Sequence, residues 1–271
     1  MAVITVSREM AALGDETAQE MSRLLGYRLV DKDALEARLK TYGVKTHTLR
    51  MYDERKPSFF AGPSKDRIEY LHYLRMAFVA ELEQGSCVFT RLGANVIFRD
   101  MPACVSVFLS ARKEIRVARV KSNFDCDEKK AARIVERSDR ERAGFHRAFF
   151  DMDWRHPENY HLSFNTGIFT PRACAEIVAS MKDRFFTPGA ETRGRAALKN
   201  MALEEKVRHM ILYEHGLPIR SLEVSASGGV VALRGAANSQ TVLDAALGLA
   251  REAAQGSDRR IVVQSEVKIY R

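Results

Sequence analysis

Arginines gather on two charged segments in the middle of the chain. In the first segment, Arg116 and Arg119 are three residues apart, so they share one face of a helix. In the second, Arg133, Arg137 and Arg140 have the same kind of spacing. Planar guanidinium groups bind phosphate oxygens and can stabilise the charge that a transferred phosphoryl group develops. These side chains therefore indicate phosphate chemistry.

Acidic side chains stand among these arginines and leave a second interpretation open. Glu114, Glu136 and Glu141 are close enough in sequence to form ion pairs with the arginines. A mixed charge run is usually a solvated helix surface, where each exposed ion pair contributes little to stability. Spacing alone does not decide between the two interpretations.

The N-terminal residues predict a strand, a connection and a helix. The apolar run AVITV at 2–6 is typical of a buried strand. Residues 15–26 have helical spacing, with Asp15 and Glu16 in the first turn, where the helix dipole favours acids. This strand and helix are the beginning of a βα unit.

Strands and helices alternate along residues 1–186, which predicts an α/β fold with a mainly parallel sheet flanked by helices. The basic-aromatic segment 51–60 is expected to be a surface loop. Further strands are expected at 87–90, 103–109 and 160–164, and further helices at 64–84, 111–121, 127–143 and 171–184.

Four segments, in this order, resemble the cytidylate-kinase-like family of P-loop proteins. They are ITVSREMAALGDETAQEMSRLLGYRLVDKDAL, FTRLGANVIFRDMPACVSVFLSARKEIRVARV, ERSDRERAGF and NYHLSFNTG. The resemblance covers about residues 2–185 and implies a P-loop-type fold. It also implies a nucleoside monophosphate kinase that uses ATP and Mg²⁺ to phosphorylate a CMP-like or other acceptor.

The resemblance places the donor phosphates at the loop that follows the first strand. Such a loop works because glycines let backbone N–H groups converge on phosphate oxygens, while a lysine and a hydroxyl bind the phosphates and magnesium. Here an acid stands where the basic residue is expected, and it opposes a triphosphate. The loop is equally well interpreted as a plain strand-to-helix connection. The phosphate-binding candidates in it are Ser7, Arg8, Gly14, Asp15 and Thr17.

The acceptor and lid residues follow from the same resemblance. Arg91 comes directly after the CVFT strand, where the family has an arginine that contacts the monophosphate, but Leu92 replaces the carboxylate that follows it. Asp31 matches a family acid, although its expected role is the N-cap of the next helix. The candidate catalytic residues of the lid are Arg112, Arg116, Arg137, Arg140, Arg142 and Asp139.

The composition changes after residue 186. Residues 187–198 are small, polar and turn-rich, and are expected to be a linker. Residues 199–271 predict a small α+β domain with the order α-β-β-α-β, in which VVALRGAANS leads into an apolar helix. This part resembles a BON domain, which implies a protein or anionic-lipid partner and no chemistry of its own.

Charge and composition limit the classes of ligand and compartment. The 271 residues have a formal charge of +8, which attracts polyanions in general and does not indicate specific nucleic-acid binding. The cysteines form no CxxC pair and the histidines no HxxxH or HExxH motif, so no metal site is expected. The charged N-terminus is not expected to be a signal peptide, and no apolar run approaches the roughly 18 residues of a membrane span. A cytoplasmic protein is expected.

Three functions remain open at this stage. The first is the phosphotransferase described above, with a divergent phosphate loop. The second is a catalytically degenerate protein that senses a nucleotide or another anion and acts through its BON-like domain. The third is a scaffold at anionic lipid or nucleic acid. Asp15 and the missing loop glycines favour the second function, whereas the arginine-rich lid favours the first.

Overall fold

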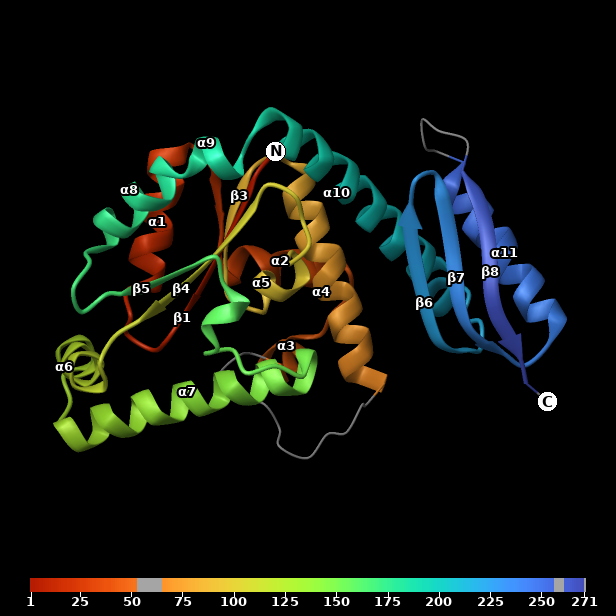
Figure 1. The fold of residues 1–271 in the computed structure, drawn as a ribbon. Coiled ribbons are helices and arrows are strands. Elements are labelled where there is room, and N and C mark those ends of the chain that lie inside the picture. The colour runs from red at the N-terminus through yellow and green to blue at the C-terminus, as the bar shows by residue number, and fades with distance from the viewer. Residues whose placement is uncertain (53–64, 256–260, 271) are drawn as a thin grey trace. The chain divides into compact units, whose positions relative to one another are not determined.

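Five parallel strands form the sheet of the N-terminal part of the protein (Figure 1). The computed structural model describes residues 1–52, 65–255 and 261–270. The strand order is β2-β3-β1-β4-β5. The strands are β1 (Val3–Arg8), β2 (Arg28–Val30), β3 (Cys87–Thr90), β4 (Cys104–Ser110) and β5 (Leu162–Asn165).

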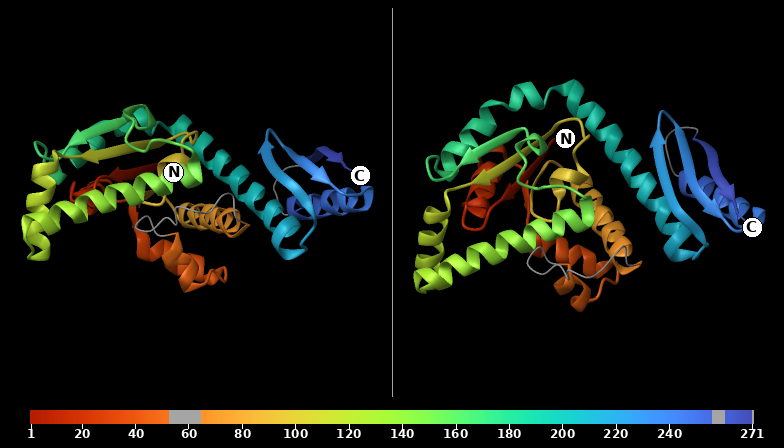
Figure 2. Two further views of the ribbon diagram at one scale, coloured as in Figure 1. Left: turned by 90° about the horizontal axis from the view of Figure 1, so that it is seen from below. Right: turned by 60° about the horizontal axis from the view of Figure 1, so that its bottom comes forward.

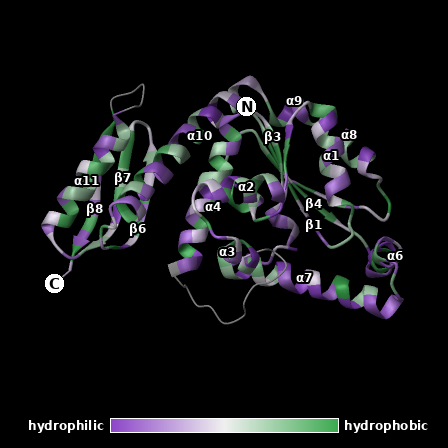
Figure 3. Ribbon diagram, turned by 180° about the vertical axis from the view of Figure 1, so that it is seen from behind, coloured by the Kyte–Doolittle hydropathy of each residue, from purple (hydrophilic) through white to green (hydrophobic). Residues whose placement is uncertain are grey.

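Helices cover both faces of this sheet, as the alternating pattern predicts. On one face, α1 (Gly14–Leu25) and α8 (Pro171–Ser180) pack on β1 and β4 through an apolar core. On the other, α4 (Lys65–Glu83) and α5 (Ala94–Ile97) pack on β3 through three phenylalanines. In Figure 3 the strands are mostly green, whereas the helices carry many purple residues. The predicted α/β fold is therefore confirmed.

The remaining helices of this part lie around the sheet. Helices α6 and α7, termed the lid helices, pack on each other beyond the carboxyl end of β4 (Figures 1 and 2). The expected surface loop 51–60 lies mostly outside the described residues. The bounds are α2 (Lys32–Thr41), α3 (Thr46–Met51), α6 (Lys113–Phe124), α7 (Glu128–Phe150), α9 (Lys182–Phe185) and a 3₁₀ turn at Pro157–Asn159.

The helix caps follow from local sequence. Asp31 precedes α2, and its side chain accepts a hydrogen bond of 3.0 Å from the Ala34 N–H, which confirms the expected N-cap. Asp127 caps α7 in the same way, with 2.7 Å to the Lys130 N–H. Helix α1 has no such cap, because Leu13 stands at the N-cap position in a left-handed conformation.

The C-terminal part has its own sheet and its own core. Strands β6 (Ile219–Ser227) and β7 (Val230–Ala237) form an antiparallel hairpin, and β8 (Val262–Ile269) pairs with β7 in parallel. Helix α11 (Gln240–Ala254) covers the sheet with the end of α10, and Ser239 caps α11. The predicted order α-β-β-α-β is therefore confirmed.

The segment expected as a turn-rich linker, 187–198, is helical. Helix α10 runs from Pro188 to His209 and continues as a π-helical turn over Met210–Glu214. The Thr187 hydroxyl accepts a hydrogen bond of 3.2 Å from the Ala190 N–H, and the alanine, arginine and glutamate residues that follow favour a helix. The chain divides into two compact units, 1–194 and 195–271, inside this helix.

Candidate functional site

The connection from β1 to α1 keeps a tightly turned backbone without the glycines that such a turn favours. Ala11 and Leu13 both have left-handed conformations, with φ of 58° and 54°. Such a conformation costs a non-glycine residue about 1–2 kcal/mol. Two of the loop N–H groups already have acceptors in the protein: Met10 donates to Asp139 Oδ1 at 3.4 Å, and Ala12 donates to the Glu9 carbonyl at 3.2 Å. These groups therefore do not converge on an external anion.

An ion-pair triad occupies the N-terminus of α1. Nη2 of Arg8 lies 2.9 Å and 3.2 Å from the two carboxylate oxygens of Asp15, and Nη2 of Arg91 lies 2.9 Å from Oδ2 of Asp15. Partial burial acts to raise the pKa of Asp15, but the positive charges of Arg8 and Arg91 outweigh it, so this pKa lies below its ordinary value. Both guanidinium groups at the N-terminus of α1 thus already bind an anion, which is the protein's own carboxylate.

The triad needs a glycine at position 14, because the Arg8 side chain leaves no room for a Cβ there. A Cβ at this position would lie 1.8 Å from Cδ of Arg8, so the Arg8 side chain passes directly over Gly14. The Arg8 residue is buried, and the Asp15 side chain is about half exposed. The remaining loop glycine therefore makes room for an internal side chain.

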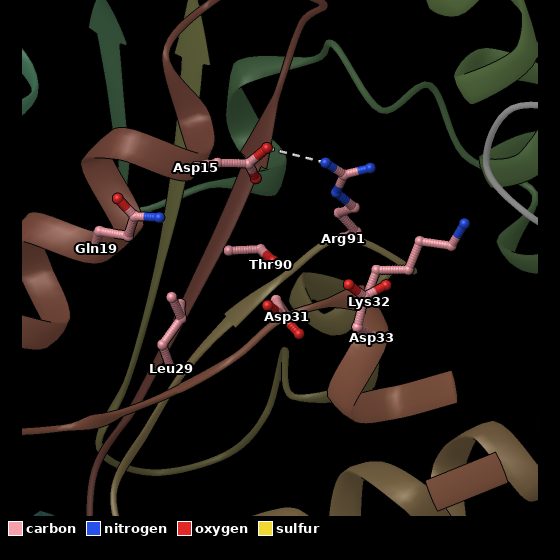
Figure 4. A pocket seen from close by; sticks show the side chains of 8 residues that line it. All are labelled: Asp15, Gln19, Leu29, Asp31, Lys32, Asp33, Thr90 and Arg91. Atoms are coloured by element: carbon pink, nitrogen blue, oxygen red, sulfur yellow. Dashed lines mark hydrogen bonds and ion pairs between the residues drawn. The ribbon is translucent and has the colours of Figure 1, made fainter. Parts of the chain in front are cut away.

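A pocket of about 430 Å³ opens beside this triad, at the carboxyl ends of β2 and β3. Figure 4 shows Asp15 and Arg91 at one end, Gln19 and Leu29 on one side, and the residues that begin α2 on the other. Ligands of open α/β sheets bind at this edge, outside the carboxyl ends of the strands. The lining residues are Asp15, Gln19, Leu29, Asp31, Lys32, Asp33, Thr90 and Arg91.

Arg91 reaches the pocket from a strained turn. Arg91, Leu92 and Gly93 follow β3 with consecutive positive φ values of 79°, 55° and 74°. Backbone strain of this kind is concentrated at functional sites. The ring of Phe150, at the end of α7, lies against Gly93, where a Cβ would be 2.2 Å from Cε2 of the ring. A lid helix therefore directly contacts the turn that positions Arg91.

Replacing Gly93 by alanine is expected to lower the free energy of unfolding by about 2 kcal/mol, because it adds both left-handed strain and a clash with Phe150. Urea denaturation measures this change. Gly26→Ala is the matched control: Gly26 has φ of 67° and nothing within 4 Å of its Cβ position, so only the strain of about 1 kcal/mol is expected. Equal losses in the two variants would contradict the Phe150 contact.

A charged network that is buried except at Arg155 joins the loop to the lid helices. Asp139 Oδ2 lies 2.7 Å from Arg116 Nη1 and 2.7 Å from Arg155 Nη2. Glu9 lies 3.3 Å from Arg116 Nε and 3.1 Å from Arg155 Nη2. Arg142 donates to the Arg8 carbonyl. The predicted lid residues Arg116, Asp139 and Arg142 therefore take part in one network of internal contacts. None of them lines the pocket.

The other sequence candidates lie apart from the pocket. Thr17 is fully buried and donates its hydroxyl hydrogen to the Leu13 carbonyl at 2.6 Å, and Ser7 Oγ lies 3.4 Å from Asn95 Oδ1. Arg137 pairs with Glu141 at 2.8 Å on the exposed face of α7. Arg112 and Arg140 are also exposed. Of the sequence candidates, Arg8, Asp15 and Arg91 meet at the edge of the pocket.

Several residues of the site were not among the sequence candidates, including the pocket residues Gln19, Leu29, Lys32 and Asp33. Glu9 and Arg155 complete the charged network, and Trp154 lies under the guanidinium groups of Arg142 and Arg155, each 5.4 Å from the ring centroid. Thr90 lines the pocket at the end of β3. Glu9 and Thr90 both stand at the carboxyl end of a predicted strand, and that position is the signal that could have identified them.

The five-stranded order and the pocket at its carboxyl edge define a P-loop-kinase-like α/β protein. A family model described as the Cytidylate kinase-like family matches residues 3–168, and the chain belongs to this family. An uncharacterised protein from Eubacterium ventriosum has 18% identity and a TM-score of 0.52, covering 68% of this chain and 98% of its own. A shikimate kinase from Bacteroides thetaiotaomicron has 13% identity and a TM-score of 0.40, covering 68% and 98%. No curated protein matches the chain.

Proposed function

We propose that the chain is a small-molecule-binding member of its family that does not transfer phosphoryl groups from ATP. This proposal rests on the triad at the N-terminus of α1, where the Asp15 carboxylate binds both Arg8 and Arg91. A triphosphate placed there would meet this carboxylate, and two unit charges 4 Å apart repel by about 4 kcal/mol at an effective dielectric constant of 20.

The residues at this position do not fit ATP and Mg²⁺. The loop N–H groups of Met10 and Ala12 have protein acceptors, and the Thr17 hydroxyl is bonded to the Leu13 carbonyl. This proposal therefore includes no step that depends on a bound nucleotide–metal complex.

Nucleoside monophosphate kinase activity is the other candidate, and one feature favours it. Arg91 lines the pocket in the place where an acceptor phosphate would bind, on a strained turn in contact with α7. For this function, a movement of the lid helices would have to release Arg91 from Asp15 and expose Arg116 and Arg142. Both of these arginines are buried, with relative exposures of 5% and 6%.

The C-terminal unit, 195–271, is proposed to report ligand binding to a partner. Its resemblance to a BON domain and its separate apolar core support an accessory module that folds on its own. Its partner would be a protein or an anionic lipid. A reducing compartment such as the cytoplasm is proposed because the four cysteines are free, and burial raises the pKa of Cys87 to about 11 and of Cys104 to about 12. None of the described helices has the length and hydropathy needed to cross a bilayer.

The direct test is a phosphotransfer assay with the full chain. The protein is incubated with ATP, Mg²⁺ and each common nucleoside monophosphate, and ADP formation is measured. No turnover above the protein-free reaction is expected. Turnover that disappears in Arg91→Ala and persists in Asp125→Asn, an exposed residue at the end of α6, would establish the kinase and overturn the proposal.

A further inference from the structure

The pocket contains polar side chains that the protein itself does not satisfy. Thr90 is 2% exposed, and its Oγ1 has no hydrogen-bond partner in the described part of the chain. Within the same residues, the side chains of Gln19 and Asp33, which are exposed to solvent, make no hydrogen bond or ion pair with the protein. A buried hydroxyl without a partner is costly, so such a group in a pocket points to a ligand.

The charges around these groups disfavour a phosphate deep in the pocket. Its lining includes three carboxylates, Asp15, Asp31 and Asp33, against two cations, Lys32 and Arg91. Arg91 pairs with Asp15 at 2.9 Å, and Lys32 pairs with Glu36 at 3.2 Å. With Arg8, which also pairs with Asp15, and with Glu36, a dianionic phosphate would meet four carboxylates and three cations, and so more negative than positive charge. Groups that donate hydrogen bonds meet acceptors at the Asp33 carboxylate and at Thr90 Oγ1.

We infer that this pocket binds a polyhydroxylated ring with adjacent hydroxyl groups, of the kind found in sugars and cyclitols, and not a phosphate group. The Asp33 carboxylate accepts hydrogen bonds from adjacent hydroxyls, since each of its two oxygens is an acceptor. Thr90 Oγ1 and the Gln19 amide bond further hydroxyls, and Leu29 contacts the carbon face of the ring. The volume of 430 Å³ lies within the range of small-molecule sites.

This inference rests on the proposed function, because it assigns the ligand class of a binding protein. It differs from that proposal in its test. The proposed function fails if the protein transfers phosphate from ATP. The inference fails if the pocket prefers phosphorylated ligands, whether or not any transfer occurs.

The experiment is a thermal-shift and calorimetric screen of the full chain against matched pairs of compounds. The panel contains free aldoses, cyclitols and nucleosides, each beside its monophosphate, and each nucleoside beside its 2′,3′-dideoxy form. At least one polyol is expected to bind, and its monophosphate no more tightly. A nucleoside that binds is expected to bind at least tenfold more weakly in its dideoxy form. Preference for the phosphate ester throughout, or no binding by any unphosphorylated polyol, would overturn the inference.

Two variants connect the binding to the named side chains. Asp33→Asn and Thr90→Val are each expected to weaken polyol binding at least tenfold, whereas Asp125→Asn, outside the pocket, leaves it unchanged. Thr90→Val also separates a binding role from a structural one. Valine has the shape of threonine and removes an unsatisfied buried hydroxyl, so the Tm should not fall. A lower Tm with unchanged binding would show that the Thr90 hydroxyl serves the fold.

Discussion

Replacing Asp139 by alanine is expected to lower the free energy of unfolding by about 3 kcal/mol, because it removes one of the two carboxylates that Arg116 and Arg155 share. The side chains of Asp139 and Arg116 are only 10% and 6% exposed, so water does not replace the lost partner. Glu9, at 3.3 Å, keeps one ion pair to Arg116 and limits the loss. Urea denaturation of the full chain measures the effect.

The matched control lies one turn away on the same helix. Glu136 pairs with Lys113 at 2.6 Å, but both side chains are 50% exposed. Glu136→Ala should therefore change the free energy of unfolding by at most about 1 kcal/mol. Similar small changes in both variants would mean that the Asp139 network contributes no more than a surface ion pair, and that its arginines remain available for phosphate.

Replacing Asp15 by lysine is expected to raise the affinity for a nucleoside triphosphate by about tenfold to a hundredfold. The change removes the carboxylate that binds Arg8 and Arg91, and it puts a positive charge at the N-terminus of α1. The Coulomb energy of about 4 kcal/mol for a charge pair at 4 Å is an upper bound, since salt screens a half-exposed site. Calorimetry at constant ionic strength measures the change.

Glu16→Lys is the control for net charge. Glu16 is the next residue on α1, is exposed and contacts neither Arg8 nor Arg91 in the described structure. The same charge reversal there should alter triphosphate affinity much less. If both variants tighten binding equally, long-range attraction explains the result, and Asp15 has no special place at the anion site.

The fold could be predicted from sequence because local patterns determine its elements. The apolar run before Ser7 and the spacing after Gly14 are sufficient for β1 and α1, and the alternation that follows is sufficient for a parallel sheet. Helix α10 could not be predicted as a whole. Pro188, Gly189 and Gly194 together resemble a turn-rich composition, whereas the Thr187 cap and the intervening helix formers act in the folded chain.

The site was harder to predict because its partners are far apart in sequence. The spacing of Arg116 and Arg119 shows a shared face, but it cannot show that Glu9 faces Arg116. Arg119 instead donates to the Ala11 and Thr166 carbonyls. The sequence did show that the Asp15 carboxylate opposes a triphosphate, but the pairing of Asp15 with Arg8 was not predicted. The part played by Arg91 required the sheet order, which places β3 beside β1.

The phosphate loop separates two properties that glycine normally supplies together. The absence of a Cβ permits left-handed backbone and also leaves clearance for a bulky anion. In this protein Ala11 and Leu13 keep the left-handed turn, so the turn survives without glycine. The clearance does not survive, because Arg8 fills the space above Gly14. Restoring loop glycines alone would therefore relieve strain without reopening the anion site, which stays closed as long as Asp15 holds Arg8 in place.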